Sequence, residues 1–156
     1  CMKLKSIIFV ISFIFFFWFF IPKYTILLNL FYALPVFSDI VYKIIGYIII
    51  GVSLGIILHM TFMFKKYGKG TPSITETTKK LVRQGIFKYT RNPMYISNSL
   101  VIVGIFFLNG HLLLLAYALL FFVSMHLFLV YVEEPELKKK YGKSYERFLE
   151  EVPRWF

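Results

Sequence analysis

Two short polar motifs at the ends of two apolar runs contain the residue types best suited to chemistry. They are Arg91-Asn92-Pro93-Met94-Tyr95 and Glu133-Glu134-Pro135-Glu136-Leu137. Free backbone N–H groups at a helix N-terminus favour an anionic group, and Arg91 adds positive charge there. The first motif therefore predicts an anion site, although an arginine in this position also commonly extends its charge toward the membrane surface.

Two adjacent carboxylates, Glu133 and Glu134, end the last long apolar run. Acidic residues contribute little to the orientation of membrane proteins, so a pair at a membrane boundary requires another reason. A cationic ligand or the basic loop before Arg91 would supply one.

The histidines offer a further candidate. His126 precedes Glu133 by seven residues, so the two side chains share one face of a helix, two turns apart. A histidine inside an apolar span is a functional candidate, with an interhelical hydrogen bond as the alternative. His59 has the same two interpretations, and His111 lies in a turn where a structural role is expected. These scattered histidines and the single cysteine, Cys1, form no metal-binding pattern.

The composition indicates a membrane protein with one domain over residues 1–156. Hydrophobic residues make up 58% of the 156 residues, and the mean hydropathy is +0.70, which is far above the usual composition of a soluble domain. The net charge of +10 flanks the apolar runs, which favours topology signals and contacts with anionic lipids over nucleic-acid binding. No glycine-rich nucleotide-binding motif is present.

The apolar runs predict an all-α integral membrane fold. About 20 apolar residues cross a bilayer, and the expected spans are residues 4–22, 40–64, 94–108 and 112–132. The last two form a hairpin. Residues 24–37 are expected to form an interfacial or re-entrant connector, with a fifth span as the alternative.

The positive-inside rule then orients the chain. With four spans, all but Lys23 and Lys43 of the 18 lysines and arginines lie on the cytoplasmic side. Both termini and both motifs are therefore expected to be cytoplasmic, in a multi-pass protein of the cell (inner) membrane. Residues 136–151 have the spacing of an amphipathic helix, which would lie on the membrane or cover a site that opens there.

The loop over residues 65–93 contains further candidates. Gly68 and Gly70 allow close approach of a ligand to the backbone, and a plain turn is the alternative. Apolar and basic residues then alternate before Arg91, which predicts an interfacial segment that could also form one wall of a ligand site. Its apolar members include Leu81, Val82 and Phe87.

These motifs, taken in order, resemble the integral-membrane methyltransferases. The elements of the resemblance are Leu81-Val82-x-x-Gly85-x-Phe87, Arg91-Asn92-Pro93-Met94-Tyr95, an apolar hairpin, Glu133-Glu134-x-x-Leu137-x-x-x-Tyr141-Gly142-x-x-Tyr145 and Val152-Pro153-Arg154-Trp155. That superfamily includes isoprenylcysteine carboxyl methyltransferases and phospholipid N-methyltransferases, and the resemblance extends from about Gly68 to the C-terminus.

The resemblance implies S-adenosyl-L-methionine as the methyl donor, bound by the loop, the ends of the last two spans and the tail. Leu81, Val82 and Phe87 would line the adenosine, and Glu133 or Glu134 would hold the amino group or ribose. The other implied cofactor-binding residues are Gly68, Gly70, Arg91, Asn92, Pro93 and Tyr95. The implied catalytic residues, which would orient the acceptor or take its proton, are His126, Tyr95 and Glu134.

Two departures from the family pattern concern the methyl acceptor. Most relatives have histidine where this chain has Asn92. The prenylcysteine enzymes are expected to place an arginine about one turn before the glutamate pair, and residues 129–132 contain none. The resulting prediction is methyl transfer to a lipophilic small molecule or lipid, of the isoprenylcysteine carboxyl type. The alternatives are phospholipid N-methylation and a non-enzymatic transporter subunit or lipid-binding scaffold.

Overall fold

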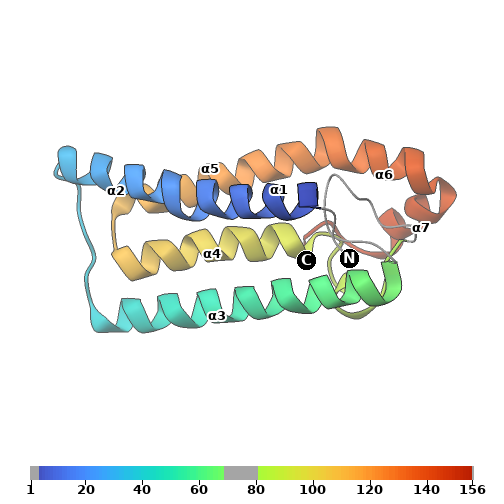
Figure 1. Ribbon diagram of the computed structural model, residues 1–156, viewed down its shortest axis with the longest axis horizontal. Coiled ribbons are helices and arrows are strands. Elements are labelled where there is room, and N and C mark those ends of the chain that lie inside the picture. Colours follow the sequence, from blue (N-terminus) through green and yellow to red (C-terminus); the bar gives the residue numbers. More distant parts are fainter. Residues whose placement is uncertain (1–3, 69–80, 156) are drawn as a thin grey trace.

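The computed structural model describes residues 4–68 and 81–155 of the chain, which form a bundle of helices (Figure 1). The α-helices of this part are α1 (Leu4–Ile14), α2 (Ile21–Phe31), α3 (Ile40–Met63), α4 (Pro93–Asn109), α5 (Leu112–Phe128), α6 (Glu134–Tyr141) and α7 (Lys143–Glu151). Helix α4 packs between α3 and α5, and α6 and α7 lie together at one end. The all-α membrane fold predicted from the sequence is confirmed for the described residues.

Three continuous helices are long and apolar enough to cross a membrane, namely Ile8–Phe31, Ile40–Tyr67 and Leu112–Tyr141. Helix α4 has 17 residues and is therefore about 25 Å long, at the lower limit for a span.

The first helix does not end at Pro22, where the sequence predicts the end of the first span. It continues to Phe31, because a π-helical segment, Phe15–Phe20, precedes the proline. In π-helical geometry the carbonyl of Phe17 would accept from residue 22, and proline has no N–H to donate. The hydroxyl of Tyr117 in α5 donates to this carbonyl instead, at 2.8 Å.

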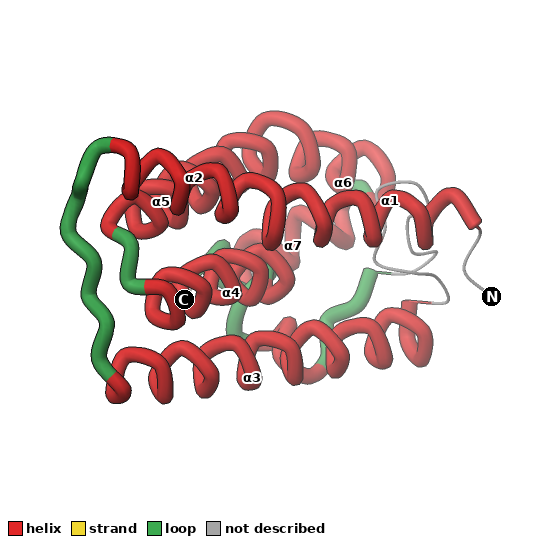
Figure 2. The backbone as a smooth tube through the Cα atoms, turned by 60° about the vertical axis from the view of Figure 1, so that its left-hand side comes forward, coloured by secondary structure: helices red, strands yellow, loops and turns green. Residues whose placement is uncertain are grey.

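The connector expected over residues 24–37 is therefore half helix and half extended chain. Asn29 in α2 is completely buried, and its side-chain amide donates to the carbonyl of Leu34 and accepts from the backbone N–H of Leu113. The extended part forms an isolated bridge between Val36 and His111. Figure 2 shows this connector crossing the end of the bundle where α4 turns into α5. Residues 24–31 belong to the first long helix, Ile8–Phe31.

Of the three glycines in α3, only Gly46 lies in close contact with α4. A Cβ atom on Gly46 would lie 2.9 Å from the carbonyl oxygen of Gly104, whereas one on Gly51 or Gly55 would meet nothing within 4 Å. Gly104 completes the contact from α4, where a Cβ would lie 2.5 Å from Ile50.

Gly110 ends α4 with a φ of 72°, and a Cβ there would lie 2.0 Å from the carbonyl oxygen of Phe37. Gly110→Ala is therefore expected to lower the free energy of unfolding by at least about 1–2 kcal/mol, the usual cost of left-handed backbone for an L-residue. Thermal melting in detergent measures this effect. Gly51→Ala is the matched control, because it adds a methyl group to a helix in open space. Equal melting temperatures for the two variants would contradict the prediction.

The tail helix expected over residues 136–151 is two helices. Helix α6 continues α5 through a π-helical segment, Leu129–Glu133, which again immediately precedes a proline-containing turn. Helix α6 ends before Gly142, whose φ is 51°, and α7 follows in a new direction (Figure 1). The apolar face of α7 is buried against the loop and α3, in a cluster that contains Met60, Val82, Phe87, Tyr145, Phe148 and Val152.

Candidate active site

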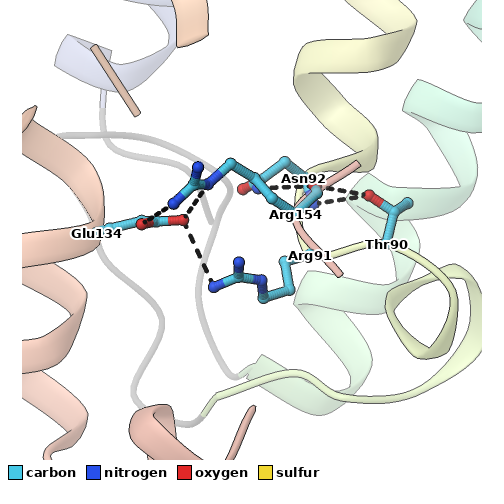
Figure 3. A network of polar contacts seen from close by, with 5 residues as sticks. All are labelled: Thr90, Arg91, Asn92, Glu134 and Arg154. Carbon is cyan, nitrogen blue, oxygen red and sulfur yellow. Dashed lines mark hydrogen bonds and ion pairs between the residues drawn. The ribbon is translucent and has the colours of Figure 1, made fainter. Parts of the chain in front are cut away.

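Glu134 at the start of α6 is held by two arginines from distant parts of the chain (Figure 3). Arg154 donates to both carboxylate oxygens, at 2.9 and 3.0 Å, and Nη1 of Arg91 lies 3.5 Å from the same carboxylate. The hydrogen bond with Glu134 raises the pKa of Arg154. The two arginines and the glutamate form a compact charged group at the α7 end of the bundle.

Arg91 has hydrogen-bonding capacity that this group does not use. Its side chain is only 9% exposed, and its Nε and Nη1 atoms are buried with no hydrogen-bond partner among the described residues. Around Glu134, two guanidinium groups thus share one carboxylate. A buried charge without full pairing is costly, so this position favours a further anionic group such as the carboxylate of a ligand.

The chain after α7 is tied to the segment before α4, and we call residues 152–155 the strap. The backbone N–H of Arg91 donates to the carbonyl of Pro153 at 3.1 Å. The carbonyl of Arg154 accepts from the side chains of Thr90 and Asn92, each at 3.1 Å (Figure 3). Asn92 is buried, and its side-chain amide nitrogen holds the strap in place. This contact positions Arg154 beside Glu134.

Tyr95 links α4 to the other carboxylate of the motif. Its hydroxyl donates to Glu133, which connects α4 to the end of the π-helical segment that follows α5. Pro93 is buried in the first turn of α4, where its missing N–H leaves no partner unsatisfied.

His126 contacts the strap. Its ring centroid is 5.7 Å from that of Trp155, which also packs on Phe122 at 5.0 Å. The Nδ1 atom of His126 is buried with no hydrogen-bond partner in the described part of the chain, so it remains available to a ligand.

A family model described as phospholipid methyltransferase matches residues 41–144, which is two thirds of the chain. The chain belongs to this family. Comparisons with curated proteins and with solved structures return no match.

The prediction of a membrane methyltransferase is confirmed by this family assignment. Members of the phospholipid methyltransferase family generally use S-adenosylmethionine as the methyl donor. The matched segment contains Arg91, Tyr95, Glu133 and Glu134 but ends before Arg154.

The apolar residues expected to line the adenosine lie beside the strap of this methyltransferase. Val82 and Phe87 are buried in one cluster with Val152, and Leu81 packs against it. Phe87 also contacts the ring of Phe64, 5.3 Å away. Their contact with a nucleoside stays a prediction. Gly68 is the last described residue of the helix that continues α3, and Gly70 lies outside the described residues.

Sequence reasoning assigned no role in the site to Arg154, Thr90 or Tyr145. The first two hold Glu134 and the strap, and the third is buried beside them, where burial raises the pKa of its phenol to about 12. The only sequence signal for Arg154 is its place in the Pro153-Arg154-Trp155 tail of the family resemblance, which identifies no partner.

Proposed function

We propose that this phospholipid methyltransferase family member transfers a methyl group from S-adenosylmethionine to the amine headgroup of a membrane lipid. The observation that carries the proposal is the incompletely paired guanidinium of Arg91 beside Glu134. The amino acid end of the donor carries one carboxylate and one ammonium group. Arg91 would hold the carboxylate, and Glu134 would hold the ammonium group in place of part of its contact with Arg154.

The remaining donor contacts follow the family resemblance. Leu81, Val82 and Phe87 would line the adenosine, and Gly68 and Gly70 would also contact the donor. Asn92, Pro93 and Tyr95 would contact the donor from the start of α4. The strap lies against Thr90 and Asn92, so it would exclude water from the donor and strengthen the electrostatic contacts there.

The acidic side of the site supports an amine acceptor over a carboxylate. Glu133 and Tyr95 are hydrogen-bonded and present an acceptor-rich surface that suits an ammonium headgroup. A carboxylate would require a free cation here, and residues 129–132 contain no arginine. Phospholipid N-methylation is therefore favoured over the isoprenylcysteine carboxyl type of reaction.

Methyl transfer to an amine requires that the donor and the acceptor are correctly positioned and that one group accepts a proton. When bound, S-adenosylmethionine supplies a methyl group attached to a sulfonium sulfur. The amine attacks this methyl group in line, and the sulfur leaves as a neutral thioether. An ammonium headgroup must first lose a proton to expose its lone pair. Glu133, or the Nδ1 atom of His126, which has no hydrogen-bond partner in the part of the chain that the structure describes, would accept that proton. Tyr95 would orient the headgroup.

The test is methyl transfer by purified protein in phosphatidylcholine nanodiscs that contain phosphatidylethanolamine and radiolabelled donor. We expect base-stable label in the mono- and dimethylated amine lipids. Base-labile label in added farnesylcysteine would favour the carboxyl alternative. No transfer to either, together with no binding of S-adenosylhomocysteine by calorimetry, would overturn the proposal in favour of a scaffold or transporter subunit.

A further inference from the structure

An apolar groove of about 850 Å³ runs between α4 and α5, with Trp155 of the strap at its Phe122 end. Helix α4 contributes Ile96 and Ser99, and α5 contributes Ala116 and Phe122. The volume lies within the range of roughly 300–1,000 Å³ that is usual for ligand sites. Exposed apolar surface is expected on any membrane protein, so the groove alone does not identify an occupant.

Ser99 is the feature that ordinary contact with lipid tails does not explain. The residue is 8% exposed and lines the groove, yet its hydroxyl has no hydrogen-bond partner in the described part of the chain. Its neighbour Ser97 donates to the carbonyl of Pro93, at 2.9 Å. A buried hydroxyl without a partner is unfavourable, and hydrocarbon cannot supply one. An occupant with a polar atom at the level of Ser99 would supply the missing partner.

The groove reaches Ile96 on α4 and Phe122 on α5, and residues of the proposed active site follow next along both helices. On α4, Tyr95 and Ser99 are four residues apart and share one face, as Phe122 and His126 do on α5. Glu133 follows His126 at the end of the π-helical segment. Along the two helices the residues change from polar at Tyr95 and Glu133 to apolar at Phe122. The Ser99 hydroxyl and the His126 Nδ1 lie between these ends, and neither has a hydrogen-bond partner among the described residues. This order matches a lipid with its headgroup at Glu133 and its chain in the groove.

The dimensions agree with this arrangement. Glu133 and Phe122 are eleven residues apart, or about 16 Å along a helix, which is comparable to half of the roughly 30 Å hydrocarbon core. Ser99 lies one turn, about 6 Å, from Tyr95 along α4. A polar atom just below the headgroup would therefore reach the Ser99 hydroxyl.

We propose that the α4–α5 groove binds one acyl chain of the lipid acceptor, and that Ser99 donates to a polar atom, such as an ester carbonyl, at the head of that chain. This inference rests on the proposed function, because the headgroup is placed by the reaction. It assigns the acceptor to lipids with an extended acyl chain, and it makes Ser99 and Trp155 the residues that set the depth of the headgroup.

The test uses photolabelling, which requires no methyl donor. Protein in phosphatidylcholine nanodiscs receives a trace of phosphatidylethanolamine with a diazirine at the end of one acyl chain. After irradiation, labelled peptides are identified by mass spectrometry. We expect labelling of the segments over residues 96–103 and 112–122, reduced at least fivefold by excess unlabelled phosphatidylethanolamine.

Two variants separate a specific groove from general lipid contact. Ala116→Trp fills the groove and is expected to reduce labelling at least fivefold. Leu120→Trp, on an exposed part of α5 outside the groove, is expected to leave it unchanged. Ser99→Ala removes only the hydroxyl, and a twofold to fivefold decrease is expected with no loss of thermal stability. Melting temperatures check that each variant is folded.

Several outcomes overturn the inference. They are equal labelling of Ala116→Trp and the unmodified protein, labelling that phosphatidylethanolamine does not reduce, cross-links between two copies of the chain, and displacement by farnesylcysteine alone. Binding of S-adenosylhomocysteine is measured separately on the same samples. Failure at the groove with intact binding therefore rejects only the acyl-chain site, and the reverse result rejects only the donor site.

Discussion

Replacing Arg91 with methionine is expected to abolish most S-adenosylhomocysteine binding while leaving the melting temperature of the ligand-free protein unchanged or higher. A charged hydrogen bond contributes about 1.5–3 kcal/mol, so affinity should fall about 10- to 150-fold. Stability should not fall, because the buried Nε and Nη1 atoms of Arg91 have no hydrogen-bond partner among the described residues. The substitution removes only the 3.5 Å ion pair with Glu134, and Glu134 keeps its two hydrogen bonds from Arg154. Calorimetry and thermal melting measure the two effects.

The control is Arg147→Met, which makes the same change at an exposed arginine of α7 and should alter neither quantity. The combination expected for Arg91 distinguishes a ligand-binding residue from a structural one. A large drop in melting temperature with unchanged affinity would assign Arg91 to the scaffold and contradict the proposed donor site.

Replacing Glu134 with glutamine is expected to lower both binding and stability. The variant leaves Arg91 and Arg154 facing each other without a carboxylate, and breaking a buried ion pair costs about 3–5 kcal/mol, with the lower end expected for this partly exposed group. It also removes the proposed partner of the donor's ammonium group. We expect at least tenfold weaker S-adenosylhomocysteine binding and a clearly lower melting temperature, measured by the same two methods.

A second substitution separates these two effects. Glu134→Gln combined with Arg154→Met relieves the repulsion between the arginines, so melting temperature should recover while affinity does not. Glu150→Gln at an exposed position of α7 is the matched control for loss of one carboxylate. If affinity returned together with stability, Glu134 would act only by holding the strap.

The helical fold could be predicted from apolar runs, but the ends of the helices could not. Prolines such as Pro22 and Pro135 normally indicate helix ends. Here the helix continues past each proline because a π-helical segment precedes it. The compensation for Pro22 comes from Tyr117, which lies 100 residues away from Phe17 in the sequence. A local pattern contains no information about such a partner.

The candidate site was predictable to the extent that it depends on charge and topology. Arg91 and Glu134 were expected at one end of the bundle, and the Nη1 atom of Arg91 lies 3.5 Å from the Oε1 atom of Glu134. The strap was not predictable, because its hydrogen bonds use the carbonyls of Pro153 and Arg154, which every residue possesses. For the same reason, the structural contact of Asn92 could not be read from its side-chain type.

Asn29 has a consequence for the synthesis of this protein. Its carboxamide is completely buried only when it accepts from the backbone of Leu113, a residue 84 positions later. At about 5–20 residues per second, the ribosome reaches that residue only several seconds after Asn29 is made. The amide nitrogen of Asn29 can pair with Leu34 at once, but its carboxamide oxygen has to remain without its partner until the last hairpin has been made.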